Sequence, residues 1–428
     1  MKIAIIGAGF TGLTAALRLT EAGHHITVIE KDSHPGGLAI GFKEKEWEWT
    51  LEKHYHHWFT NDKFILGLAQ EIGHKVIIKR PESSVYIDGK IFQFDSPKQV
   101  LLFPKLPLID RIRMAGVIGL IRYNPFWKPL EKINASTFLP KAMGRKAYKM
   151  IWEPQFLNKF GRSAGNVSLA WLWARIAKRT PSLAYPEGGF LNFANHLVKT
   201  IEEKGGKVIL NSEIVEVKEK DNTVEVASSN MGKKLKIENY DRVIFTLSSF
   251  LFLKITPQLP AIYKSKFLPL KNLGATNLVL RLKKPFLRGN TYWLSICDSK
   301  APIMAVVEHT NFMNKTNYNN EHLVYLGNYY ETNDPRFLMT KEAKLKLIDP
   351  FLKKINPSYK KNLIGYELFK APFAQPVIPT NYSKMIPSMT TPLKNVYLAN
   401  MQQVYPWDRG TNYAVELGEK VARLISNS

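Results

Sequence analysis

The stretch KIAIIGAGFTGLTAALRLTEAGHHITVIE, residues 2–30, decides the fold of this chain. Residues 2–6 are an apolar strand candidate, residues 7–12 form a glycine-rich turn, and residues 13–22 have helical periodicity. A second apolar strand at 26–29 follows and leads into Glu30. This order of strand, glycine turn, helix and strand predicts a nucleotide-binding βαβ unit.

Each glycine of the turn has a separate predicted task. Gly7 permits the tight turn, Gly9 lets the backbone approach a pyrophosphate, and Gly12 lets the helix pack closely on the strand. Glu30 can accept hydrogen bonds from ribose hydroxyls. The other turn residues, whose amides lie where a helix N-terminus faces phosphates, are Ala8, Phe10 and Thr11.

A glycine hexamer alone also fits an ordinary strand-to-helix turn, so its surroundings decide its meaning. The helix stops at Gly23, Glu30 follows Gly12 by eighteen positions, and Pro35-Gly36-Gly37 comes shortly after. This context favours nucleotide binding. An isolated glycine pair would be a surface turn, but a resident flavin needs backbone contacts beyond the βαβ unit, whereas a nicotinamide cofactor that leaves after each turnover does not.

Glu30-Lys31 followed by Gly36-Gly37-Leu38 resembles the extended FAD fingerprint of the flavin amine oxidase superfamily, which includes phytoene desaturases and protoporphyrinogen oxidases. The resemblance implies a resident, non-covalent FAD. One departure is Leu38, which stands where the family usually has an arginine. A phosphate or carboxylate contact expected there is therefore in question.

The resemblance extends over nearly the whole chain. Tyr185-Pro186-Glu187-Gly188-Gly189-Phe190, a helix, and then strands near 207–217 look like the middle of phytoene desaturase and protoporphyrinogen oxidase sequences. In that family Ile214 would lie where backbone groups meet the adenine, and residues 241–246 would return the chain to the nucleotide sheet. From the residues alone, these stretches are a helix, a hairpin and a buried strand.

A helix at 411–426 follows a short strand at 395–399. In the superfamily a helix here directs its backbone amides at the flavin pyrimidine. The resemblance therefore implies cofactor contacts at Gly410, Thr411, Asn412 and Ala414.

Two further departures occur around this helix. The family commonly has a glycine and an acid after the strand, but this chain has Asn400 and Met401, so a pyrophosphate or ribityl contact must be made differently. Gly410 stands near where amine oxidases place a ring of their aromatic cage. The missing ring counts against amine oxidation.

A length of 428 residues predicts two or three folding units. Alternating helical and strand-like stretches without internal repeats indicate an α/β fold. With the resemblance, we expect a Rossmann-type FAD-binding domain, discontinuous in sequence and built from 1–75, 185–265 and 390–428. The intervening residues 76–184 and 266–389 would form a mixed α+β substrate domain.

His54, Tyr55, His56 and His57 are the most chemically suggestive side chains outside the glycine motifs. The resemblance places them along the flavin. A histidine could shuttle a proton at neutral pH and Tyr55 could orient a substrate, although buried histidines satisfied by backbone groups are an equally good interpretation. No nearby cysteine or carboxylate set completes a metal shell, so no metal is expected.

The formal net charge is +24, from 60 basic and 36 acidic side chains. Such a charge attracts nucleic acid or anionic lipid headgroups, but abundant lysine, asparagine and isoleucine produce the same bias without any partner. We do not expect nucleic acid as a partner.

The apolar start is already the first strand, so no secretory leader is expected and the cytoplasm is the default location. A single cysteine, Cys297, excludes an intrachain disulfide.

Residues 101–121 are apolar but interrupted by charges, so no transmembrane helix is expected. Residues 106–127 mix apolar and basic side chains, as either a core helix or an interfacial membrane segment would. Both interpretations can hold. They leave open a peripheral contact with an anionic membrane on its cytoplasmic face.

The sequence predicts an FAD-dependent oxidoreductase that acts on a hydrophobic, isoprenoid- or lipid-like substrate by hydride transfer to flavin N5. Aromatic residues such as Tyr292, Tyr329 and Trp407 could line a substrate tunnel or simply belong to the core. Three alternatives remain: a flavin amine oxidase, a flavin-dependent isomerase or mutase without net redox change, and a surface-binding protein with a degenerate nucleotide fold. No pattern sets the oligomeric state.

Overall fold

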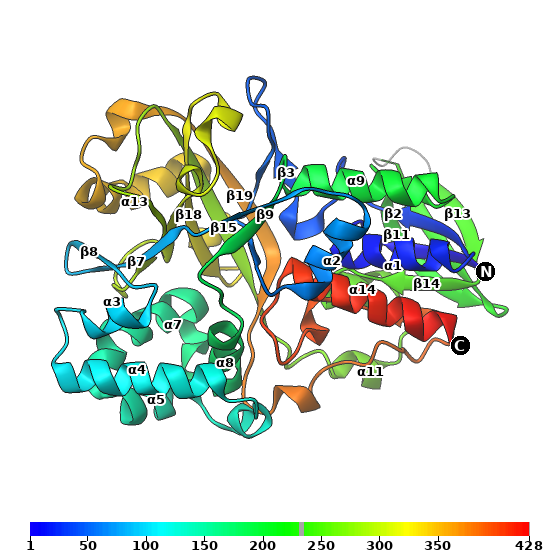
Figure 1. Cartoon of the computed structure of the whole chain (residues 1–428). Helices are drawn as coiled ribbons and strands as arrows, with labels where there is room; N and C mark the ends of the chain where they lie inside the picture. The colour runs from blue at the N-terminus through cyan, green and yellow to red at the C-terminus, as the bar shows by residue number, and fades with distance from the viewer. Residues whose placement is uncertain (231–234, 428) are drawn as a thin grey trace.

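The fold is described from a computed structural model that covers residues 1–230 and 235–427. Figure 1 shows two parts side by side. One is a layered α/β unit that contains β1 and α14, and the other combines a large sheet with a block of helices. The predicted α/β class is confirmed.

The first part is built on a parallel five-stranded sheet in the order β10-β2-β1-β14-β20. Three distant segments of the chain supply these strands. Central β1 is buried on both faces from Ile3 to Ile6, as a strand inside a parallel sheet must be. The strands are β1 (Lys2–Ile6), β2 (His25–Ile29), β10 (Lys207–Ile209), β14 (Arg242–Phe245) and β20 (Val396–Leu398).

The alternation of side chains along β1 places a different layer on each face of the sheet. Ile3 and Ile5 join a core shared with helices, whereas Ala4 and Ile6 join a core shared with an antiparallel three-stranded sheet. The helices are α1 (Phe10–Glu21), α2 (Lys63–Glu71), α9 (Phe190–Glu203) and α14 (Thr411–Ser426). The second sheet consists of β11 (Glu213–Lys220), β12 (Thr223–Ser229) and β13 (Leu235–Tyr240).

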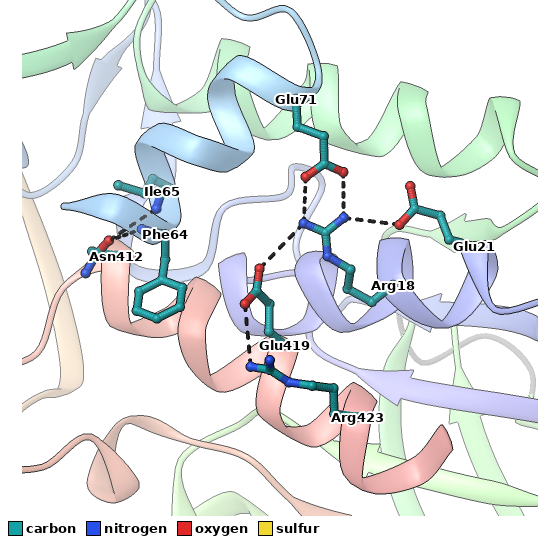
Figure 2. Close-up of polar contacts among 8 residues, drawn as sticks. All are labelled: Arg18, Glu21, Phe64, Ile65, Glu71, Asn412, Glu419 and Arg423. Carbon is teal, nitrogen blue, oxygen red and sulfur yellow. Dashed lines mark hydrogen bonds and ion pairs between the residues drawn. The ribbon is translucent and has the colours of Figure 1, made fainter. Parts of the chain in front are cut away.

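Helices α1 and α14 touch backbone to backbone. A Cβ atom added at Gly418 would lie 2.5 Å from the carbonyl oxygen of Thr11. Arg18 of α1 forms ion pairs with Glu71 of α2 at 2.5 Å and with Glu419 of α14 at 3.5 Å (Figure 2). The earliest helix of the chain is thus held against the latest one.

The second part is a seven-stranded mixed sheet in the order β19-β15-β18-β17-β16-β7-β8. A hairpin turn at Asp88-Gly89 joins β7 to β8, with both residues at positive φ. The strands are β7 (Glu82–Ile87), β8 (Lys90–Gln93), β15 (Asn272–Leu282), β16 (Thr291–Ile296), β17 (Ala305–Glu308), β18 (His322–Tyr330) and β19 (Leu363–Pro376).

A helical block covers this sheet and shares its core. Its helices are α3 (Pro97–Leu101), α4 (Leu108–Tyr123), α5 (Ala135–Met143), α6 (Arg145–Ala147), α7 (Glu153–Phe160) and α8 (Leu169–Ala177), and α13 (Lys341–Ile355) packs at the far end. The remaining helices are α10 (Ser249–Ile255), α11 (Ala261–Ser265) and α12 (Pro335–Leu338). Small sheets pair β3 (Gly41–Phe42) with β4 (Leu51–Glu52), and β9 (Leu183–Pro186) with β5 (Trp58–Phe59) and β6 (Val76–Lys79).

Helix α4 has one face in the core and one in solvent. Met114 and Ile121 are buried, whereas Ile109 and Leu120 are 69% and 75% exposed. The expectation of a core helix holds in part, because the same helix also presents an apolar surface; the membrane contact stays a prediction. Within the described residues, no helix combines the length and apolar character needed to cross a bilayer.

Candidate functional site

The two glycine turns of the N-terminal motif meet in space. A Cβ atom added at Gly37 would lie 3.0 Å from Cα of Gly9, and the amide of Gly36 donates to the carbonyl of Ala8 across 2.9 Å. Helix α1 begins after Gly9 without a side-chain cap. The turns therefore form a backbone cradle beside uncapped helix amides, which suits a pyrophosphate.

Gly7 and Gly12 allow the close backbone approach on which the shape of this cradle depends. A Cβ atom on Gly12 would lie 2.0 Å from the carbonyl oxygen of Gly7, so only glycine fits there. Gly7 has a φ of 106°, and a Cβ on it would lie 2.7 Å from Oγ1 of Thr246. Phe10 and Thr11 lie inside the fold, where the ring of Phe10 stacks on Phe193.

Glu30 lies at the end of β2, next to the cradle. Its two carboxylate oxygens accept hydrogen bonds from the amides of Ala8 at 2.8 Å and Asp32 at 2.9 Å. Burial raises the pKa of Glu30, while these two amides oppose the rise. Each oxygen keeps a further lone pair for a ribose hydroxyl. Lys31 beside it is exposed.

The start of α14 is also open to a ligand. Gly410 is exposed and gives the helix no side-chain cap. Thr411 is fixed by Trp58, whose Nε1 donates to its Oγ1 across 2.8 Å. The side chain of Asn412 points elsewhere: its Oδ1 accepts from the amides of Phe64 and Ile65 at the start of α2 (Figure 2).

Asn412 therefore has a structural task that its place in the closing motif did not reveal. Its Nδ2 group and its backbone are left for the predicted cofactor contact. Ala414 packs partly against the core of the first part of the molecule.

Asn400 is similarly occupied. Its side chain donates to the carbonyl of Leu247 and to Oγ of Ser249, and its own amide donates to Gln403. No donor of Asn400 remains free for a cofactor, which leaves half-buried Met401 as the nearer candidate.

Two of the predicted contacts lie at the margins of the cradle. Leu38, where an arginine was expected, packs against the core of the second part. At the predicted adenine position, the β11–β12 register shifts between Ile214 and Glu216, which leaves Val215 without a partner residue on β12.

The stretch His54–His57 lies deep in the protein but keeps accessible surface. Burial lowers the pKa of His54 to about 3, of His56 to about 4 and of His57 to about 3. All four side chains of the stretch are nevertheless only half-buried. Groups that are both deep and accessible face an interior space, and here the imidazoles are neutral at pH 7.

Hydrogen bonds determine the tautomers of the His54 and His56 rings. The amide of Asn277 donates to Nδ1 of His54 across 2.6 Å, and Nδ1 of His56 donates to the carbonyl of His54 across 2.6 Å. Nε2 is therefore a donor on His54 and an acceptor on His56. The ring of Tyr55 meets that of Trp293 edge-on, with centroids 5.0 Å apart. These groups can orient a ligand, but their neutral state does not suit a proton shuttle at neutral pH.

Sequence reasoning missed a group of charged residues next to this stretch. Asp408 accepts hydrogen bonds from Arg175 at 2.7 Å and from Nε1 of Trp171 at 3.2 Å. Arg409 donates to Gln375 at 3.0 Å and to the hydroxyl of Tyr329. The full group, called the basic cluster below, consists of Lys159, Arg175, Arg179, Asp408 and Arg409.

A second missed residue is Glu52, which is fully buried in β4. Its carboxylate accepts hydrogen bonds from the hydroxyl of Tyr185 at 2.8 Å and the amide of Phe190 at 2.9 Å. Burial raises its pKa to about 7 despite these donors. Among the described residues it has no cationic partner. No sequence signal marked it, because Glu52 stands among other charged residues between Glu46 and Lys53.

We expect Glu52→Gln to remove one source of pH dependence in stability. Because the folded pKa is raised, the stabilisation from protonated Glu52 is complete below about 4.5 and is lost as pH rises through about 7. Glutamine mimics the protonated acid, so the variant should gain up to about 3 kcal/mol over wild type between pH 5 and pH 8. Thermal melting of both proteins across this range measures it, with exposed Glu331→Gln as control. Parallel pH profiles would contradict the expectation.

This geometry fits what known proteins show. The family model of the flavin-containing amine oxidoreductases matches residues 10–426, and the chain belongs to that family. Membership of this family supports FAD as the cofactor, as the resemblance implied. Figure 1 places the cradle and the start of α14 in the same part of the molecule.

Curated relatives are similar over parts of their length. An inactive all-trans-retinol 13,14-reductase of Danio rerio is 24% identical over 56% of this chain and 46% of its own. A 15-cis-phytoene desaturase of Narcissus pseudonarcissus is 27% identical over 35% of this chain and 25% of its own. The matches thus span less than half the length of these relatives. A solved oxidoreductase from Methanosarcina mazei has the same fold, with a TM-score of 0.77 at 18% identity, covering 99% of this chain and 100% of its own.

The residues present fit FAD. The cradle between Gly9 and Gly37 is a space that a Cβ on either residue would begin to fill, and the uncapped amides of α1 and α14 supply donors. The buried carboxylate of Glu30 completes the ribose end of the arrangement. Among the described residues, no group of three or more histidine, cysteine, aspartate or glutamate side chains could hold a metal.

Proposed function

We propose that this protein oxidises a hydrophobic, isoprenoid- or lipid-like substrate. Bound FAD supplies a hydride acceptor at its N5 atom. The observation that carries the proposal is the deep stretch His54–His57, whose neutral imidazoles and aromatic neighbours offer a dry, oriented site without a strong acid or base. Hydride abstraction from carbon needs such a site more than it needs proton transfer. Two relatives named for retinol and phytoene, both hydrophobic molecules, support the substrate class.

The chain would bind both the nucleotide end and the flavin end of FAD, without a covalent bond. We assign the pyrophosphate to the cradle of residues 7–12 and 36–38, the ribose to Glu30 with Lys31 nearby, and the adenine to the strand around Ile214. Met401 and the backbone of residues 410–414 would meet the ribityl chain and the flavin ring. Cys297 is a poor tether because it is buried, and burial raises the pKa of its thiol to about 12.

The substrate side of the site would be set by His54, Tyr55 and His56. Nε2 of His54 donates, Nε2 of His56 accepts, and burial keeps the hydroxyl of Tyr55 protonated by raising its pKa. These groups would orient the reacting carbon and exclude water. An amine substrate is disfavoured, since the cations of the basic cluster would repel an alkylammonium ion.

The test is spectroscopic. The purified protein should show a bound flavin spectrum, and lipid extracts should bleach it anaerobically, whereas amines should not. Bleaching by amines with release of peroxide would replace the proposal with amine oxidation. Turnover of a substrate only after prior reduction, with no net bleaching, would replace it with a mutase or isomerase.

We also propose that α4 rests on an anionic membrane, from which a lipid substrate would be reached. Its exposed apolar residues lie beside arginines whose charge is not compensated: Arg111, Arg113 and Arg122 donate to backbone carbonyls and form no ion pair in the described part of the chain. Anionic headgroups complement this combination of apolar and basic groups. The exposed apolar residues are Leu108, Ile109, Ile112, Leu120, Tyr123 and Phe126.

Ile109→Glu and Leu120→Glu should each reduce binding to phosphatidylserine-containing vesicles by at least about tenfold in a flotation assay. Either change puts a charge where the apolar face would enter the headgroup region. Leu338→Glu is the control, because Leu338 is 64% exposed on α12, away from this face. Equal binding of all these proteins would place the membrane contact elsewhere or remove it.

A further inference from the structure

We propose that the basic cluster is a binding subsite for a phosphate or diphosphate group carried by the substrate. The inference rests on the proposed function and narrows its substrate class to an amphiphile, with an apolar part to be oxidised and an acidic head group. Nothing in the FAD assignment above uses these residues.

The charges of the cluster do not balance. Among the described residues, Asp408 is the only carboxylate that forms an ion pair with any of the four cations, and its partner is Arg175. In the part of the chain described, Lys159, Arg179 and Arg409 have no ion-pair partner. Lys159 is buried, Arg409 is half-buried and Arg179 is exposed. An unpaired buried charge costs several kcal/mol, so these cations, gathered without a carboxylate partner, indicate that a counter-charge comes from a ligand.

Lys159 shows how the fold tolerates this arrangement. The residue is only 7% exposed, and its ammonium lies over the rings of Trp171 at 5.0 Å and Tyr329 at 5.3 Å. Cation–π contacts replace a carboxylate in part. Burial nevertheless holds the pKa of Lys159 well below its ordinary value. An arriving anion would restore the charged form.

Arg179 shows that the cluster is open to a ligand. It counts among the exposed residues, yet burial lowers its pKa to about 10. The guanidinium is therefore accessible although protein lies around it. Its backbone carbonyl accepts a hydrogen bond from Arg122 at 3.0 Å, which fixes the segment to α4. Among the described residues its side chain has no hydrogen-bond partner.

The position of the cluster fits a substrate rather than the cofactor phosphates. Lys159 lies on α7 and Arg175 on α8, both in the helical block, whereas the cradle lies at β1 and α1. After burial, the charge of Arg179 is the next cause that lowers the pKa of His57. The cluster therefore adjoins the histidine stretch. Several cations around one space suit phosphate oxygens, which accept forked hydrogen bonds from arginine.

The test uses the FAD-bound protein and three probes. Dodecyl phosphate, dodecanol and inorganic pyrophosphate are titrated while the bound flavin spectrum is recorded. We expect dodecyl phosphate to bind at least about tenfold more tightly than dodecanol, and more tightly than pyrophosphate. Pyrophosphate binding as tight as dodecyl phosphate would show a site for a free anion and overturn the assignment to a substrate head group. Equal binding of dodecanol would overturn the anion site itself.

Two variants separate binding from folding. Arg179→Gln should weaken dodecyl phosphate binding about tenfold or more and leave FAD content unchanged, whereas exposed Arg162→Gln on the same block should change neither. Lys159→Met should weaken binding and raise the melting temperature, because it removes an unpaired buried charge. A lower melting temperature with unchanged binding would assign Lys159 a structural role and count against the proposal. If lipids without phosphate bleached the flavin and phosphate esters did not, the phosphate subsite would be refuted. The proposed oxidation of a hydrophobic substrate would still stand.

Discussion

Gly9→Leu is expected to give a folded protein that contains no FAD. Gly9 has ordinary extended backbone angles, and a Cβ atom there would meet only Cα of Gly37, at 3.8 Å. The fold can therefore accept a side chain at this position. The side chain would fill the cradle where the backbone has to approach the pyrophosphate. Loss of a helix-capping glycine should cost no more than about 1 kcal/mol.

The ratio of flavin absorbance to protein absorbance measures the loss, and circular dichroism shows whether the fold remains. Gly9→Ala, with a single methyl group, should retain part of the flavin. Gly12→Ala provides the contrast, since its Cβ would lie 2.0 Å from the carbonyl oxygen of Gly7 and should damage the fold itself. A yellow Gly9→Leu protein would show that the pyrophosphate lies elsewhere.

Gly418→Ala is expected to destabilise the protein by about 3 kcal/mol, the upper part of the range for overpacked cores. The added methyl group would lie 2.5 Å from the carbonyl of Thr11 and 2.8 Å from Cβ of Thr14. Helix α14 would then have to move away from α1, which would also shift its N-terminus. We expect a lower melting temperature together with weaker FAD retention.

Gly116→Ala is the matched control, because the substitution is chemically the same and also lies inside a helix. Nothing lies within 4 Å of a Cβ at Gly116. Alanine is a better helix former than glycine by about 1 kcal/mol, so this variant should melt slightly higher than wild type. If both substitutions raised the melting temperature, the close approach of α1 and α14 would be refuted.

The βαβ unit could be predicted because its determinants are adjacent in sequence. Gly7, Gly9 and Gly12 act on neighbouring backbone, and the periodicity of 2–29 is clear without knowledge of the rest of the chain. The resemblance to a family then placed the later strands and the closing helix. The structure agrees with them in detail, as the parallel pairing of β14 with β1 shows.

The basic cluster could not be predicted in the same way. Lys159, Arg175 and Arg409 come from three segments that meet only after the sheet and the helical block have packed. One local signal existed: Trp171 and Arg175 are spaced four residues apart and share one side of α8, and Arg179 follows just after the helix ends.

The place of a residue in a motif also does not show which way its side chain points. Asn412 stands within the closing motif, yet its side chain turns away to hold the start of α2. Asn400 likewise uses its donors within the fold.

The strand order of the parallel sheet also determines when the sheet can be completed during translation. β1 leaves the ribosome before its neighbour β14, which is made only from Arg242 onwards, and α14 is made only from Thr411 onwards. Until then the nascent chain exposes an unpaired strand edge and the apolar side of α1, surfaces that attract chaperones and aggregate readily. If the start of α14 contacts FAD as proposed, cofactor loading is a late event, and a ribosome that stops before residue 411 is expected to release a colourless, protease-sensitive chain. Acquisition of FAD would report that translation has passed this point.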